Sequence, residues 1–172
     1  RSLTEEEWRR LADASFLRDG RSEELGEGRL RSGMPSRWTV DYAYEGMRLR
    51  MRLGLTSFKH VGLFPEQAAT WNFLYDNCVR MRAEERTPNV LNLFDYTGGA
   101  TLAARAAGAD TTHVDSVKQV VTWARENMEQ SGLEGVRWIV EDALKLVQRD
   151  VRRGNRYTCL LDPSEAADDV SV

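Results

Sequence analysis

The chain has 172 residues, of which 41% are hydrophobic and 30% charged, and its formal net charge is −3. This predicts one medium-sized domain with a small N-terminal attachment, and it excludes a basic surface over the whole molecule, although local basic faces can still occur. The two cysteines, Cys78 and Cys159, are too few for a disulfide framework, and no apolar run approaches the ~20 residues of a membrane span. We therefore expect a cytoplasmic protein with no membrane partner. Because the chain begins without a methionine, we expect its natural N-terminus to lie upstream.

The N-terminal segment predicts one short helix followed by a loop. Thr4 and Glu7 have the spacing of a capping box, and Trp8 and Leu11 give the following turns an apolar side. Residues 18–35 are rich in Gly, Ser, Arg and Glu, which indicates a loop.

A β-hairpin is predicted next. Apolar and polar residues alternate from Trp38 to Leu55, and Glu45-Gly46 between the two runs is a turn signal. One face of the second strand carries three arginines, for which two interpretations stay open. The favoured one is a solvated strand face, and the other is contact with a nucleic-acid backbone. The three arginines are Arg48, Arg50 and Arg52.

A helix is expected after Pro65, which suits a first helical turn. Its apolar residues fall at i, i+3, i+4 and i+7, so they form one stripe that we expect to be buried. Cys78 belongs to this stripe and is interpreted as a small core residue. The stripe consists of Trp71, Leu74, Tyr75 and Cys78.

After Pro88 the pattern becomes strand, helix, strand, helix. The predicted strands are 89–95, 111–115, 136–140 and 157–162, and the first helix is 99–107. This alternation predicts right-handed βαβ units, and hence an α/β fold with a Rossmann-like, doubly wound parallel sheet. The domains expected are an N-terminal extension of helix, loop and hairpin over 1–57 and the Rossmann-like domain over 58–172.

Candidate site residues follow the four strands, because ligands of such sheets bind beyond the carboxyl ends. The glycines of Thr97-Gly98-Gly99 let the backbone approach a ligand, and the next helix offers free N–H groups. Asp115 can accept hydrogen bonds from both hydroxyls of a ribose, and Asp142 can accept one from the exocyclic amine of an adenine. Asp162-Pro163 would lie beside the reacting centre.

Each aspartate also has a purely structural interpretation. Asp115 and Asp142 both precede helices, where Asp is a common N-cap, and Asp162 can belong to a simple turn. The joint pattern, with acids at three successive strand ends after a glycine turn, favours a nucleoside-binding site.

This series resembles the class I S-adenosylmethionine-dependent methyltransferases, in particular the branch that modifies bacterial 23S ribosomal RNA of the large subunit. Segment 91–99, Leu-Asn-Leu-Phe-Asp-Tyr-Thr-Gly-Gly, looks like the first cofactor motif of that branch. Further matching segments are 60–67, 113–116, 123–127, 141–143 and Asp162-Pro163.

The resemblance implies S-adenosyl-L-methionine as cofactor and a methyltransferase that acts on RNA. It places Gly98 and Gly99 beside the methionine part, Asp115 at the ribose and Asp142 at the adenine. Asp162 and Pro163 would be catalytic, near the transferable methyl group, and no metal is needed. The complete set of implied cofactor-binding residues is Phe64, Gln67, Asp95, Tyr96, Thr97, Gly98, Gly99, Asp115, Ser116, Asp142, Ala143 and Asp162.

The chain departs from the family pattern in three ways. Asp95 stands where the family has a small residue, and its carboxylate is a candidate partner for the cofactor's ammonium group. A second proline does not follow Asp162-Pro163. A complete fold of this class has seven strands, whereas this sequence predicts only the first four, so we expect a further segment or a partner to cover the edge of strand four.

Two alternative functions stay open. The chain can be a catalytically impaired methyltransferase-like module that binds RNA or assists assembly. It can also be a nicotinamide-dependent oxidoreductase, since Asp115 suits that ribose too, but the first turn lacks the Gly-x-Gly-x-x-Gly pattern.

Overall fold

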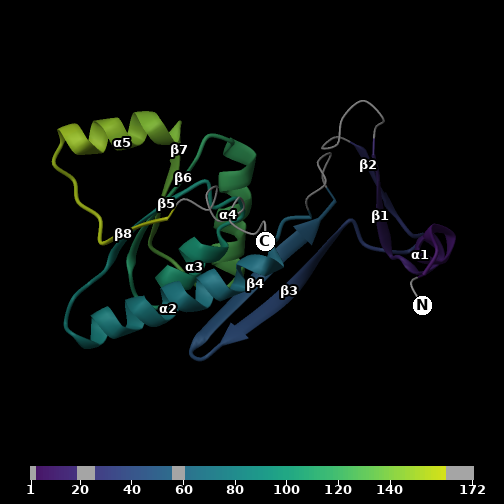
Figure 1. Cartoon of the computed structure of the whole chain (residues 1–172), viewed down its shortest axis with the longest axis horizontal. Coiled ribbons are helices and arrows are strands. Elements are labelled where there is room, and N and C mark those ends of the chain that lie inside the picture. Colours follow the sequence, from purple (N-terminus) through teal and green to yellow (C-terminus); the bar gives the residue numbers. More distant parts are fainter. Residues whose placement is uncertain (1–2, 19–25, 56–60, 162–172) are drawn as a thin grey trace. The chain divides into compact units, whose positions relative to one another are not determined.

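The computed structural model describes residues 3–18, 26–55 and 61–161. These residues form two compact units (Figure 1). The smaller unit contains residues 1–40 and 52–63, and the larger contains 41–51 and 64–172. The domain boundary expected between residues 57 and 58 lies outside the described residues. None of the described helices is long and apolar enough to cross a membrane.

The smaller unit begins with helix α1 (Glu5–Leu11), which has the predicted capping box: the Thr4 hydroxyl accepts from the Glu7 N–H, and the Glu7 carboxylate accepts from the Thr4 N–H. Strands β1 (Ala14–Arg18) and β2 (Gly26–Leu30) follow and pair antiparallel. The loop predicted over 18–35 is therefore wrong at β2. Its Gly, Glu and Arg residues have no apolar alternation, so pairing with β1 defines the strand.

Strands β3 (Arg37–Tyr44) and β4 (Met47–Gly54) form the predicted hairpin. On β4 the apolar residues are buried and the intervening residues are more exposed, as the alternation indicates. The tip of the hairpin groups with the larger unit. Two tyrosines of β3 explain this, because the Tyr42 hydroxyl donates to Asn72 Oδ1 and the Tyr44 hydroxyl donates to Asp76 Oδ2, both at 2.8 Å.

The larger unit contains a parallel sheet in the order β7-β6-β5-β8. The chain adds β6 and β7 on one side of β5 (Asn89–Leu93) and then crosses to place β8 on the other side. A switch of direction at β5 is the point where ligands of doubly wound sheets bind. The other strands are β6 (Asp110–Asp115), β7 (Val136–Val140) and β8 (Cys159–Leu161).

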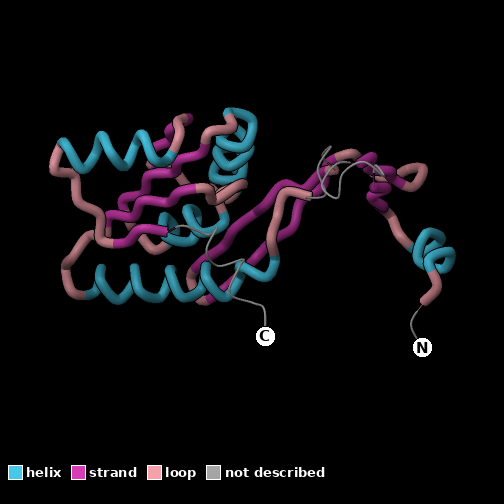
Figure 2. The backbone as a smooth tube through the Cα atoms, turned by 45° about the horizontal axis from the view of Figure 1, so that its top comes forward, coloured by secondary structure: helices cyan, strands magenta, loops and turns pink. Residues whose placement is uncertain are grey.

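Helices cover both faces of this sheet (Figures 1 and 2). Helix α5 (Ala143–Arg152) lies on one face, where Ala143 and Leu146 pack against Leu91, Leu93 and Val114. The other face is covered by the short 3-10 helix η1 (Pro65–Gln67) with α2 (Ala68–Ala83), by α3 (Gly99–Ala106) and by α4 (Lys118–Gln130). The return crossover to β8 requires α5 to lie opposite α3 and α4 if all crossovers are right-handed.

The predicted stripe of α2 is buried, and Cys78 is only 2% exposed. Burial raises the pKa of its thiol to about 11, which confirms a core residue and argues against a reactive one.

Candidate functional site

The first strand end is a loop with an unusual backbone. Strand β5 ends at Leu93, two residues before the predicted end, because Phe94 and Tyr96 adopt positive φ angles of 61° and 47°. Gly98 follows with φ 93° and is the N-cap of α3. Non-glycine residues in this region are strained and cluster at functional sites. The loop of residues 94–98 is therefore the prime candidate for close approach to a ligand.

The carboxylate of Asp95 closes this loop from inside. Oδ2 accepts from the Thr101 N–H at 2.8 Å and Oδ1 accepts from the Ala100 N–H at 3.3 Å, so Asp95 occupies N–H groups of α3 that the sequence predicted to be free. Its side chain is 9% exposed. Burial raises the pKa of Asp95 to about 6, partly offset by these hydrogen bonds, and the charge of Asp115 raises it further. Asp95 therefore acts first as a cap of α3.

Beneath Asp95, a buried polar pair joins α3 to β6. The Thr101 hydroxyl lies 3.0 Å from His113 Nδ1 and is hydrogen-bonded to the Asp95 carboxylate. The His113 side chain is fully buried and its ring packs on Trp138 at 5.0 Å between centroids. Burial lowers the pKa of His113 to about 4, which keeps the imidazole neutral.

Asp115 ends β6 beside this loop. Phe94 N–H donates to the Val114 carbonyl at 3.1 Å, and Glu141 N–H donates to the Asp115 carbonyl at 3.2 Å, so the ends of β5, β6 and β7 are adjacent. Asp115 is half-buried, and burial raises its pKa. Oδ1 accepts from the Val117 N–H at 2.8 Å. The next residue, Ser116, is exposed.

Asp142 follows β7 and is the N-cap of α5. Its Oδ1 accepts from the Lys145 N–H at 3.0 Å, so the capping interpretation of this aspartate is confirmed. Asp142 is exposed, which leaves its second oxygen accessible. Ala143 packs into the core beneath α5, so only its backbone can face a ligand.

Aromatic rings and the two glycines complete the surroundings of the loop. The Tyr96 ring lies between Phe64 and Trp123, with centroid distances of 5.3 Å and 6.1 Å. Gly99 allows close packing, because a Cβ there would lie 2.4 Å from the Trp71 ring. Thr97 is buried, and Gln67 is half-buried at the start of α2. The predicted Asp162 and Pro163, and also His60, lie outside the described residues.

Comparison with solved structures shows which known fold the chain shares. A SAM-dependent methyltransferase from Agrobacterium tumefaciens is 38% identical, with a TM-score of 0.78, and the match covers 92% of this chain and 48% of that chain. The chain has the fold of the class I S-adenosylmethionine-dependent methyltransferases. A structure from Streptococcus mutans, 21% identical with a TM-score of 0.64, covers 78% of this chain and 34% of that chain, and shares the fold.

Curated relatives agree with this methyltransferase fold. The ribosomal RNA large subunit methyltransferase K/L of Magnetococcus marinus is 39% identical over 90 residues, and that of Shewanella frigidimarina is 31% identical over 112 residues. The matches cover 51% and 63% of this chain but 11% and 15% of those proteins, so the chain spans a small part of the curated relatives. No family model matches the chain. The resemblance read from the sequence motifs is confirmed.

One residue that contacts the loop of residues 94–98 was not predicted from the sequence. Asn127 of α4 is fully buried, and its Nδ2 donates to the Thr97 carbonyl at 3.0 Å. The segment containing it was matched to the family, but no role followed from the match. An asparagine on the same helix side as Ala124 and Ser131 is a signal that could have indicated a contact, since asparagine is a poor helix former.

Two arginines on the polar face of β4 form hydrogen bonds within the hairpin. Arg50 Nε and Nη2 donate to the two oxygens of Asp41 at 2.7 Å and 3.0 Å, and Arg48 Nη1 donates to the Glu45 and Met47 carbonyls. The side chains of Arg50 and Asp41 are both more than half exposed. The exposure of Arg48 and Arg50 agrees with the favoured interpretation of a solvated strand face, whereas Arg52, the third arginine, is half-buried.

Proposed function

We propose that this chain binds S-adenosyl-L-methionine and forms the cofactor-binding part of a methyltransferase that acts on RNA, with ribosomal RNA as the expected substrate class. The observation that carries the proposal is the set of three carboxylates, Asp95, Asp115 and Asp142, at adjacent tips of parallel strands beside the Thr97-Gly98-Gly99 turn. Acidic groups in this position suit a ligand with a cationic sulfonium, an ammonium group and a nucleoside.

The chemistry of the residues fits that ligand. Gly98 and Gly99 bring the backbone close to the amino-acid part, and Oδ2 of Asp115 is left to accept from ribose hydroxyls. The exposed oxygen of Asp142 is proposed to accept from adenine. When bound, the cofactor supplies an activated methyl group. The protein then has to align a nucleophile with it and exclude water, and Asp162 and Pro163, which follow β8 in the sequence, are proposed to do so.

RNA as the substrate is supported by the names of the curated relatives. A cytoplasmic location is proposed with it, because RNA modification of this kind and two unpaired cysteines both suit that compartment. Strand β8 pairs with β5 on one side, and Leu160 is 56% exposed. We propose that a further chain segment or a partner covers this edge.

Calorimetric titration with S-adenosylhomocysteine tests the cofactor. Asp115→Asn is expected to weaken binding by at least tenfold, because a charged acceptor for two hydroxyls is lost. Asp110→Asn is the matched control, since Asp110 begins the same strand at the opposite end and is exposed. Equal affinities of the two variants would contradict the placement of the ribose.

Two further measurements separate the alternatives. A rise in the melting temperature with NAD, but not with S-adenosylhomocysteine, would favour the oxidoreductase. Transfer of tritiated methyl groups from S-adenosylmethionine to total RNA would support the enzyme. Cofactor binding without transfer to any RNA would favour the catalytically impaired module.

A further inference from the structure

The loop of residues 94–98 needs support from outside itself. Three of its residues, Phe94, Tyr96 and Gly98, have positive φ, and a strained backbone of this kind persists only when its surroundings hold it. Within the segment, the Gly98 N–H donates to the Asp95 carbonyl at 2.8 Å. The Asp95 carboxylate ties the loop to the start of α3. Neither contact holds the carbonyl of Thr97, which lies between the last two positive-φ residues.

Helix α4 supplies that contact. Asn127 is fully buried and Thr97 is 3% exposed, and the Asn127 Nδ2 donates to the Thr97 carbonyl at 3.0 Å. Because water does not reach this pair, loss of the Asn127 amide leaves a buried carbonyl without this donor. Asn127 lies one turn after Trp123, whose ring packs against Tyr96. Helix α4 therefore fixes the loop both by a hydrogen bond and by packing.

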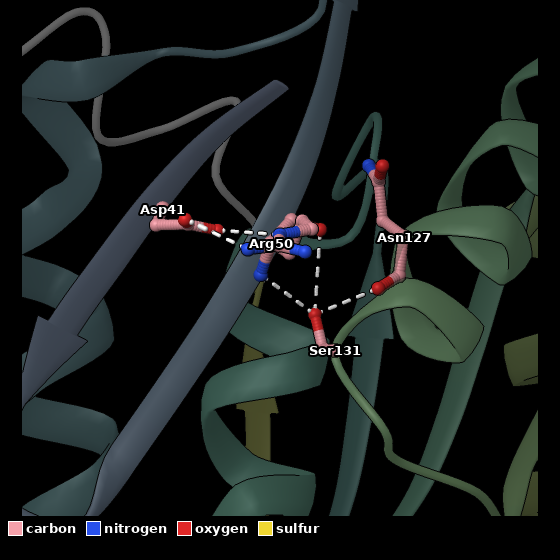
Figure 3. A network of polar contacts seen from close by, with 4 residues as sticks. All are labelled: Asp41, Arg50, Asn127 and Ser131. Carbon is pink, nitrogen blue, oxygen red and sulfur yellow. Dashed lines mark hydrogen bonds and ion pairs between the residues drawn. The ribbon is translucent and has the colours of Figure 1, made fainter.

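A second hydrogen-bonded residue fastens the end of α4 to the hairpin (Figure 3). The Ser131 hydroxyl donates to the Asn127 carbonyl at 2.7 Å, and it accepts from the Arg50 N–H of β4 at 2.9 Å. Arg50 is in turn held by Asp41. In this view the Asn127 carboxamide points away from Ser131, whereas its backbone carbonyl is directed toward the Ser131 hydroxyl.

We propose that Asn127 is a positioning residue that holds the Thr97 carbonyl, and with it the Tyr96–Gly99 turn, in the shape that receives the amino-acid part of the cofactor. Asn127 acts through Thr97 and contacts no ligand itself. Ser131 anchors the helix that carries it. The identity of the ligand rests on the proposed function, whereas the effect on the loop does not.

Two ligands and a matched variant test this role. Asn127→Ala is compared with Val121→Ala, which removes buried atoms from the same helix and has no hydrogen bond to the loop. Asn127→Ala is expected to bind S-adenosylhomocysteine about tenfold more weakly than the unsubstituted chain, and 5′-methylthioadenosine, which lacks the amino-acid part, with unchanged affinity. Val121→Ala is expected to bind both ligands as the unsubstituted chain does. A merely structural role would weaken the binding of both ligands equally, and that outcome would overturn the proposal.

Hydrogen exchange tests the loop without any ligand. The amides of Gly98, Ala100 and Thr101 are expected to exchange faster in Asn127→Ala than in Val121→Ala at equal overall stability. If S-adenosylhomocysteine does not bind the unsubstituted chain, the proposed function fails and the ligand part of this inference fails with it. If it binds, but exchange at these three amides is unchanged in Asn127→Ala, only the role of Asn127 is overturned.

A measurement on the unsubstituted chain covers the case in which Asn127→Ala does not fold. By NMR, the Asn127 side-chain amide is expected to exchange with water at least tenfold more slowly than the amide of an asparagine in a free peptide, since the group is buried and bonded to Thr97. Exchange as fast as in the free peptide would overturn the proposal.

Discussion

The Asp95 carboxylate and the His113 imidazole lie 4.0 Å apart beneath the first turn of α3, yet they do not form an ion pair at neutral pH. Burial lowers the pKa of His113 to about 4, so the imidazole is neutral while the carboxylate is charged. The Thr101 hydroxyl lies 3.0 Å from Nδ1 of the imidazole and also contacts the Asp95 carboxylate, so it bridges the two groups. Two groups that are commonly paired as ions here share one hydroxyl.

The two groups give opposite pH dependences of stability. The pKa of Asp95 is about 6 in the folded chain and 3.8 as its ordinary value, so the folded state binds more protons between these values and stability falls as pH rises through them. The pKa of His113 is about 4 when folded and 6.5 ordinarily, so the folded state binds fewer protons and stability rises with pH. Over pH 4–6 the two contributions largely cancel.

Substituting either residue should reveal the pH dependence of stability that the other residue contributes. We expect the unfolding free energy of Asp95→Asn to rise between pH 4.5 and 6.5, with a slope up to ~1.4 kcal/mol per pH unit from His113. His113→Gln should show the opposite slope, from Asp95. Urea unfolding at pH 4.5, 5.5 and 6.5 measures both. Parallel curves for the two variants would show that these groups do not titrate as the burial indicates.

The close approach of Gly99 to Trp71 predicts a costly substitution. In Gly99→Ala the new Cβ would lie 2.4 Å from Cε2 and Cζ2 of Trp71, so the ring or the start of α3 has to shift. We expect a loss of about 1–3 kcal/mol of unfolding free energy, as for other overpacked sites. Thermal and urea unfolding measure this loss.

Gly154→Ala is the control for Gly99→Ala. Gly154 has φ +69° and no atom within 4 Å of an added Cβ, so only the left-handed conformation is strained, by ~1 kcal/mol. Relief of the Gly99→Ala penalty in a Trp71→Leu background would identify the ring as the cause. An equal penalty in both backgrounds would contradict it.

The main sheet could be predicted from the sequence because its strands are apolar runs separated by amphipathic helices. Strand β7 has the predicted bounds. Strand β5 is shorter than predicted, since Phe94 leaves the β region, and apolarity alone does not show such a turn. Strand β2 was missed because its Gly, Glu and Arg residues have no period of two, and partner pairing is a tertiary effect.

The candidate site could be predicted as a set of residue types at strand ends, but not as a set of contacts. The sequence places Asp115 and Asp142 at neighbouring strand ends, and the sheet order confirms that, whereas the third predicted acid, Asp162, lies outside the described residues. It does not show that Asp95 turns inward to cap α3, since that depends on a positive φ on each side of it. Nor does it show the contact of Asn127 with a carbonyl 30 residues away.

Helix α5 carries two leucines of opposite exposure, which can test where its buried side lies. Leu144 is 65% exposed, and Val151, another apolar residue of this helix, is 71% exposed. Leu146 is fully buried in the core with Leu91 and Val114. Leu146→Ala should lose about 2–5 kcal/mol of unfolding free energy, whereas Leu144→Ala should change it by less than about 0.5 kcal/mol. Comparable losses in urea unfolding would contradict this difference in burial.

Asp142 has a confirmed capping role and a proposed adenine contact, and two substitutions separate them. In Asp142→Ser the hydroxyl can still accept from the Lys145 N–H, so helix stability should stay within a few tenths of a kcal/mol. The serine is too short to reach an adenine amine, so affinity for S-adenosylhomocysteine should fall by about three- to tenfold. Asp142→Ala should lose the same affinity and also ~1 kcal/mol of stability.

Calorimetry gives the affinity of each variant for S-adenosylhomocysteine, and urea unfolding gives the stability of each variant. Binding of Asp142→Ser equal to that of the unsubstituted chain, with Asp142→Ala weaker, would mean that the aspartate serves only as the cap of α5. Weakened binding in Asp142→Ser with unchanged stability would instead assign the exposed oxygen to the ligand, because the cap is intact in that variant.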